Sequence, residues 1–241
     1  MRVSAVILSL RKAPVDADGS AIHFFMFSAM TMLVPGLLIV LPSTQEFGLW
    51  LVAENHPIEI LTFVVAIWAA VEGVRLVRYL GAKSGFLIRG FLSLFTFLMF
   101  FLAMEEISWG QKFLDFPTPE FWKARNAQGE LTLHNYDFAG HKYLEIYPFL
   151  FGIGGLVGIA LRASYLLPWI VCPPVRLWPV FGIVVVHSGI DLYHDFHVVS
   201  LAFDALINLL DEAAEMLVAC GGLFFLLLNR RSLMKLSGDA R

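Results

Sequence analysis

Long apolar runs alternate along the chain with short polar segments, and this pattern predicts an all-α membrane protein. Five runs have the ~20 residues that a helix needs to cross a hydrocarbon core of ~30 Å, and a sixth is slightly shorter. The expected spans are roughly 21–42, 57–80, 86–106, 144–164, 175–194 and 205–228. We therefore expect one transmembrane domain, residues 1–241, built as a bundle of about six helices. A long outer loop, about 112–143, is expected to lie on the membrane surface, and prolines make the apolar stretch 165–174 an expected interfacial loop.

Composition and charge agree with this class and predict an orientation. The chain is 58% hydrophobic and only 15% charged, which is too apolar for an ordinary soluble domain. Six spans place 13 of the 17 Lys and Arg on the side of the termini, and 16 of the 20 Asp and Glu and 6 of the 7 His on the other side. By the positive-inside rule both termini are cytoplasmic. We expect a multi-pass protein of the bacterial inner (cell) membrane whose acidic face is periplasmic.

The third span ends in a group of polar residues, Glu105-Glu106-Ile-Ser108-Trp109-Gly-Gln111. A charged side chain at membrane depth costs about 2.5–3.5 kcal/mol, so two adjacent carboxylates need a reason. One reason is an ordinary helix end that meets water. The other is that the group takes part in a site, with Trp109 as an interfacial anchor.

The outer loop contains the polar segment 126–135, which includes Glu130 and His134. Loop residues of this kind are usually solvated. Alternatively, His134 folds over the mouth of the bundle and supplies a ligand or a proton carrier.

The fifth span carries His187, Asp191 and His194 near its outer end. At ~100° per residue these three side chains fall on one stripe two turns long. Imidazole and carboxylate are the usual ligands of zinc and non-haem iron. A metal-free His–Asp relay and a polar helix end are the alternatives.

The sixth span begins with Asp211, Glu212 and Glu215, which share a face because they are three and four residues apart. A helix that starts near residue 205 would place Glu215 about 15 Å below its start. Either Glu215 is protonated, or a His or a bound cation neutralises it. Elsewhere, Glu59 is expected at the outer rim, and Glu72 is expected to pair with Arg75 or Arg78 in a structural role.

These groups converge in the predicted topology on one site. The candidate catalytic residues are Glu105, Glu106, His134 and Glu212, and the candidate metal ligands are His187, Asp191, His194 and Glu215. The implied cofactor is a divalent metal, zinc or iron, and the implied partner is membrane lipid, with a small-molecule or lipid-linked substrate that enters from the outer leaflet. Hydrolysis is favoured over di-iron oxidation, because the Glu-x-x-His pairs of soluble di-iron bundles are missing.

The Glu105-Glu106 pair resembles the start of the CAAX-type membrane protease signature, and His187-x-x-x-Asp191 resembles its later His motif. The general plan is similar to the alkaline ceramidase class of membrane zinc hydrolases. Gly110 stands where the protease signature has Arg, and the span count differs from both families, so the chain is assigned to neither.

Two other function classes stay open, a proton- or cation-coupled transporter and an accessory subunit of a membrane complex. A conducting path should continue to the cytoplasm. The inner halves of the third, fifth and sixth spans are nearly all apolar, which favours a pocket. Gly152, Gly154, Gly155 and Gly158 indicate close helix packing instead of a pore. No nucleic-acid partner is expected, and a homo-oligomer is possible.

Overall fold

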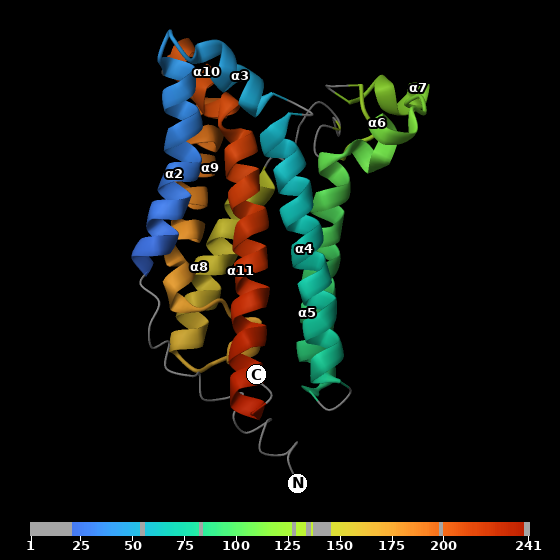
Figure 1. The fold of residues 1–241 in the computed structure, drawn as a ribbon, viewed down its shortest axis with the longest axis vertical. Coiled ribbons are helices and arrows are strands. Elements are labelled where there is room, and N and C mark those ends of the chain that lie inside the picture. Colours follow the sequence, from blue (N-terminus) through green and yellow to red (C-terminus); the bar gives the residue numbers. More distant parts are fainter. Residues whose placement is uncertain are drawn as a thin grey trace.

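Among the residues that the structure describes, six helices of 17 residues or more form the body of the protein. The computed structural model describes residues 21–53, 56–81, 84–126, 129–133, 136, 146–197 and 200–238. The long helices are α2 (Ala21–Val40), α4 (Pro57–Leu80), α5 (Phe86–Glu106), α8 (Tyr147–Ala163), α9 (Trp178–Phe196) and α11 (Asp211–Ser237). Successive long helices run in opposite directions, and α11 lies between α4 and the group formed by α2, α8 and α9 (Figure 1). The described residues form no strand, so the all-α prediction is confirmed.

Short helices connect the long ones. They are α3 (Gln45–Val52), α6 (Gln111–Leu114), α7 (Glu120–Lys123), α10 (Leu201–Leu209) and the 3₁₀ turns η2 (Ser108–Gly110), η4 (Trp169–Val171) and η5 (Val175–Leu177). The four short α-helices all lie at one end of the bundle, where α6 and α7 project sideways beyond the end of α5 (Figure 1). We call this the acidic end, because Glu106 closes α5 and Asp211 opens α11 there. The basic end is the opposite one, with Arg78, Arg162 and Arg230.

In the part of the chain that the structure describes, four segments are long and apolar enough to cross a membrane. They are Ala21–Val40, Gln45–Leu80, Phe86–Glu106 and Trp169–His194, and α8 is a shorter apolar helix. The predicted sixth run is divided at Leu210 into α10 and α11. Glu215 therefore lies only about 6 Å, one turn, into α11, and not the 15 Å that a single continuous helix would give.

The main core surrounds α11, which is the most completely buried helix. Leu217, Val218, Leu223 and Leu226 on α11 are at most 4% exposed. They belong to the same buried cluster as Leu76 of α4 and residues of α5 and α9. In contrast, α2 and the outer faces of α4 and α5 expose many large apolar side chains. Burial on the inside and exposed apolar residues on the outside are what a helix bundle in lipid requires.

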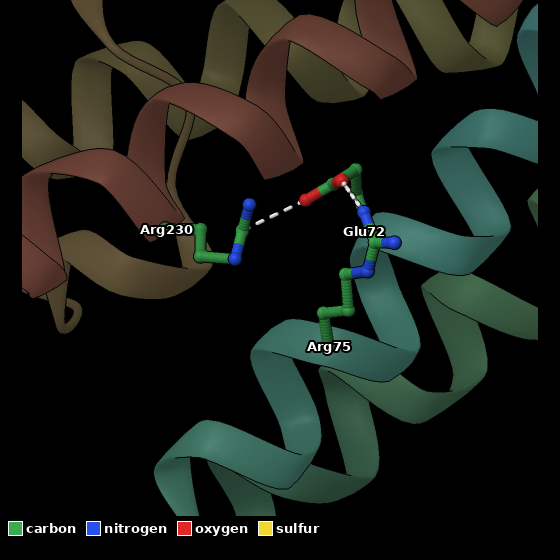
Figure 2. Close-up of polar contacts among 3 residues, drawn as sticks. All are labelled: Glu72, Arg75 and Arg230. Atoms are coloured by element: carbon green, nitrogen blue, oxygen red, sulfur yellow. Dashed lines mark hydrogen bonds and ion pairs between the residues drawn. The ribbon is translucent and has the colours of Figure 1, made fainter.

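A buried ion-pair network closes the basic end between α4 and α11. Glu72 is 2% exposed, and its carboxylate lies between two guanidinium groups (Figure 2). Arg75 Nη1 is 2.6 Å from Glu72 Oε1, and Arg230 Nε is 2.7 Å from Glu72 Oε2. The predicted Glu72–Arg75 pair is confirmed, and Arg230 is the partner that the sequence did not indicate.

The stretch 165–174 is exposed at Tyr165, Leu166 and Leu167 and mostly buried from Trp169 onward. Trp169 and Cys172 are each 1% exposed, and Trp169 begins a candidate membrane span. Buried carbonyl groups need donors. Arg162 Nη1 and Asn229 Nδ2 donate to the carbonyl oxygens of Trp169 and Cys172 over 3.0–3.3 Å. These two polar side chains satisfy the buried carbonyl groups of the proline-broken segment, and the interfacial position of 165–174 stays a prediction.

Close packing of α8 on α9 confirms the interpretation of three of the four glycines on α8. A Cβ atom on Gly152 would lie 2.6 Å from Val185 Cγ2, and one on Gly155 would lie 2.2 Å from Phe181 Cδ1. Gly158 similarly faces Pro173, whereas Gly154 faces open space.

Candidate functional site

Three carboxylates from two helices meet at the acidic end. Glu106 is the last residue of α5, and Glu212 and Glu215 lie in the first two turns of α11. Each offers a carboxylate oxygen within 4.8 Å of the other two. Glu106 is buried, and the other two are partly buried. We call these three residues the carboxylate cluster. Among the described residues no other group of three or more His, Cys, Asp or Glu is close enough to share a metal ion.

Two further residues contribute to the surroundings of the cluster. Glu59 of α4 is a third acidic neighbour of Glu106, after Glu215 and Glu212. Side-chain hydrogen bonds join Glu106 to Glu215 and Tyr147, the first residue of α8, to Glu215. Helices α5, α8 and α11 therefore bring a polar side chain to one place, and the charge of Glu59 on α4 acts on Glu106.

A proton or a cation shared between the carboxylates would stabilise this arrangement. Two carboxylate groups at hydrogen-bond distance repel each other unless they share a proton or bind a cation. Oxygens bound to one divalent cation at ~2.0–2.4 Å are at most about 4–5 Å apart, which the cluster satisfies. The donor set consists of carboxylate oxygens, the preferred ligands of hard divalent cations.

Glu105 has a different environment from Glu106, although both are buried. Its carboxylate accepts a hydrogen bond from Trp109 Nε1 at 2.6 Å and another from the backbone N–H of Leu133. Ser108 donates to Glu130, and the Leu131 N–H donates to Gln111 Oε1 at 3.0 Å. The segment 129–133 is thereby attached to the end of α5.

The backbone after α5 is strained at the same place. Ser108 and Trp109 have φ values of 47° and 56°, in the left-handed region that non-glycine residues rarely adopt, and Gly110 follows at 81°. Strain of this kind costs about 1–3 kcal/mol per residue and often occurs at functional sites. Here it turns the chain sharply, so that Trp109 can bond to Glu105 while Glu106 faces Glu212 and Glu215.

The histidines of α9 lie beside other carboxylates. His187 Nε2 is 2.9 Å from Asp211 Oδ1, and His194 Nδ1 is 3.7 Å from Asp204 Oδ1 of α10. Both histidines are buried. The structure does not group His187, Asp191 or His194 with Glu215 at distances that one metal ion could bridge. Helical periodicity places these three side chains on one face of α9, but it does not determine which neighbouring helix that face contacts.

The sequence therefore indicated part of the site. Glu106, Glu212 and Glu215 were candidates and come together, and Glu59, expected at the rim, lies beside them. Tyr147 was missed; its one sequence signal is a hydroxyl at the outer end of an apolar span. His134 lies outside the described residues, although Leu133, the residue before it, bonds to Glu105.

An apolar cavity lies between α5 and α8, and it is lined by Glu105 and Tyr147 but by none of the three cluster carboxylates. Its volume is about 430 Å³, and its lining includes Glu105, Leu133 and Tyr147 together with Leu102, Leu150 and Phe151. Pockets of ~300–1,000 Å³ that combine apolar walls with a few polar groups are typical of ligand sites.

These features define the class: a helical membrane protein with a carboxylate site at one end of its bundle. No protein-family model, curated protein or solved structure matches the chain.

Proposed function

We propose that this protein is a membrane enzyme that hydrolyses a lipid or lipid-linked substrate at the carboxylate cluster, with a divalent cation as cofactor. The observation that carries the proposal is the position of the cluster. Three carboxylates that can share one ion are linked, through the hydrogen bond of Tyr147 to Glu215, to an apolar cavity that Tyr147 and Glu105 line between α5 and α8. A substrate with both a hydrocarbon part and a polar part suits that combination.

The proposed ligands limit the choice of cation to divalent ions that accept carboxylate oxygens. Zinc or iron was expected from a set that contained two histidines. An oxygen-only set also suits manganese and magnesium, which prefer carboxylate ligands. Any of these ions, when bound, polarises water or a carbonyl or phosphoryl oxygen.

The protein residues would then have separate tasks. Glu106, Glu212 and Glu215 hold the ion, and Glu215 additionally accepts the hydrogen bond that the Tyr147 hydroxyl donates. A carboxylate of the cluster that is released from the ion can accept a proton from water as general base. Glu105 positions the site, because it ties segment 129–133 to α5.

We further propose that the chain crosses the bacterial inner membrane six times, with α8 and α11 as the two additional spans. The 27 residues of α11 extend over about 40 Å, which is enough to cross the bilayer. The basic end would face the cytoplasm with both termini, and the cluster would face the periplasm. Exposed Phe113, Leu114 and Phe121 beside α6 and α7 support a surface-lying outer loop at the acidic end.

A site closed on one side supports an enzyme better than a transporter. Inward from Glu215, α11 continues with buried Leu217, Val218, Ala219 and Cys220. These side chains give a proton or cation no polar route along α11 toward the basic end.

Metal analysis of the detergent-purified protein tests the proposal. We compare the wild type with Glu106→Gln, Glu215→Gln and the matched control Glu46→Gln, which alters an exposed carboxylate on α3 at the same end. About one divalent cation per chain is expected in the wild type and the control, and a loss of at least tenfold in affinity for Mn²⁺ is expected in both cluster variants. Equal metal content in all four proteins, or none in any, would contradict the proposal.

A further inference from the structure

Two apolar cavities lie one after the other between α5 and α8. The first, of about 430 Å³, begins at Glu105 and Tyr147. The second, of about 310 Å³, lies further toward the basic end and is lined by Phe91, Gly158 and Phe225, among others. Phe95 and Phe151 line both cavities, so these two rings form the partition between them.

The partition is part of a packed aromatic group. The ring centroids of Phe95 and Phe151 are 6.4 Å apart, and Phe95 also makes an edge-to-face contact with Phe225 at 5.0 Å. Phe151 in turn contacts Phe181 at 5.5 Å. Contacts from α5, α8, α9 and α11 hold these rings in place, so the partition is well supported against movement.

The first cavity has the polarity and the length of a single lipid chain. Its outer end is polar, at Glu105 and Tyr147, and its remaining walls are apolar side chains such as Leu98, Leu102 and Leu150. From Glu105 to Phe95 is ten residues of α5, or about 15 Å. That is half of the ~30 Å hydrocarbon core, the depth that the chains of one leaflet occupy.

We propose that the first cavity holds one hydrocarbon chain of the lipid substrate, with the substrate's polar group beside Tyr147 and the carboxylate cluster, and that Phe95 and Phe151 set the maximum chain length. This inference rests on the proposed function, since it names the substrate of that site. A chain that enters between α5 and α8 exchanges lipid neighbours for similar apolar walls, so the polar group and the partition decide which lipid is retained.

The proposal makes Phe95 a residue that determines specificity. Its replacement by alanine removes one of the two rings of the partition and should join the two cavities. A chain longer than the first cavity can then continue into the second. A few methylene groups in a pocket change binding by roughly 10-fold or more, so we expect about a tenfold gain for a long chain and little change for a short one.

Photo-crosslinking of the purified protein in detergent tests the proposed chain site and its length limit. The probes are lauroyl and stearoyl lysophosphatidylcholine, each with a diazirine at the end of the chain, and the cross-linked peptides are identified by mass spectrometry. In the wild type, the lauroyl probe should label α5 or α8 near Phe95 and Phe151, and the stearoyl probe should label them weakly. Phe95→Ala should raise stearoyl labelling about tenfold and move it toward Phe91 and Gly158.

The control is Phe97→Ala, which alters an exposed ring of α5 that lines neither cavity and should change neither probe. Phe95→Leu keeps more bulk than alanine and should give an intermediate gain, which guards against a folding defect in the alanine variant. Equal labelling by both probes in every variant, or no labelling between α5 and α8, would overturn the chain site.

The metal measurements keep the two proposals apart. If Glu215→Gln loses the cation but keeps the labelling pattern, the chain site and the cluster are independent and both stand. Labelling without any bound cation in the wild type would refute the proposed cofactor and leave the chain site intact. A bound cation in the wild type without any labelling would refute the chain site and leave the proposed cofactor intact.

Discussion

The buried carboxylates at the two ends of the bundle have opposite electrostatic surroundings. At the basic end Glu72 lies between Arg75 and Arg230, and each of its oxygens faces a guanidinium nitrogen. At the acidic end Glu106 lies among Glu212, Glu215 and Glu59, and the charges that act on it are carboxylates. The first arrangement is complete within the chain and stabilises the packing of α4 on α11. In the second, carboxylates lie close enough to share a proton or a cation, and this proximity is the reason why we propose a function for it.

The histidines show the same distinction within the acidic end. His187 and His194 each lie close to one aspartate. Such pairs connect α9 to α10 and α11. A pair of opposite or neutral partners is ordinary structural chemistry, whereas three neighbouring carboxylates are not.

The largest effect on stability is expected when the ion-pair network of Glu72, Arg75 and Arg230 at the basic end is broken. Glu72→Ala leaves Arg230 partly buried without its carboxylate and should lower the free energy of unfolding by about 3–5 kcal/mol. The measurement is unfolding in mixed micelles of increasing SDS fraction. Replacing Glu72 and Arg230 together with leucine should recover most of the loss. If the single variant is as stable as the wild type, the basic end is not a structural network.

The next largest effect on stability is expected in the middle of the bundle, where α8 packs on α9. Gly155→Ala drives a Cβ atom into the Phe181 ring and should cost about 1–3 kcal/mol by overpacking. Gly154→Ala, on the same helix but facing open space, is the matched control and should be neutral or slightly stabilising, because alanine favours helix. Equal losses in both variants would show that α8 does not pack on α9 through this face.

A smaller effect of opposite sign is expected at the carboxylate cluster. In EDTA, which keeps divalent cations away, Glu215→Gln removes one of the repelling carboxylates and should raise stability by about 0.5–2 kcal/mol. The same variant should lose cation binding. The comparison fails if Glu215→Gln is destabilising in EDTA, because Glu215 would then be a structural partner like Glu72.

The smallest effect is expected at the His187–Asp211 pair. Asp211→Asn replaces a bond to a partly exposed carboxylate and should cost about 0.5–1.5 kcal/mol. His187→Asn should be similar, and neither variant should reduce the amount of cation bound. Metal content that falls in His187→Asn would return this histidine to the ligand set that the sequence suggested.

The pattern of the sequence was enough to predict the membrane class, the approximate limits of most long helices and the acidic residues that gather at one end. Local information suffices for these properties, because apolar length, proline positions and the segregation of charge act within a helix or across the bilayer. Spacing also predicted that Glu212 and Glu215 share a face, and they do.

Which side chains come into contact depends on how the helices pack in the tertiary structure. The break at Leu210 moved Glu215 to the second turn of α11, and the packing of α9 directed His187 to Asp211 instead of the cluster. Tyr147, Arg230 and the Phe95–Phe151 partition likewise depend on how helices distant in sequence rotate against one another. Periodicity gives the face of each helix but not the azimuth of its neighbours, because many side-chain contacts along the whole bundle set that rotation together.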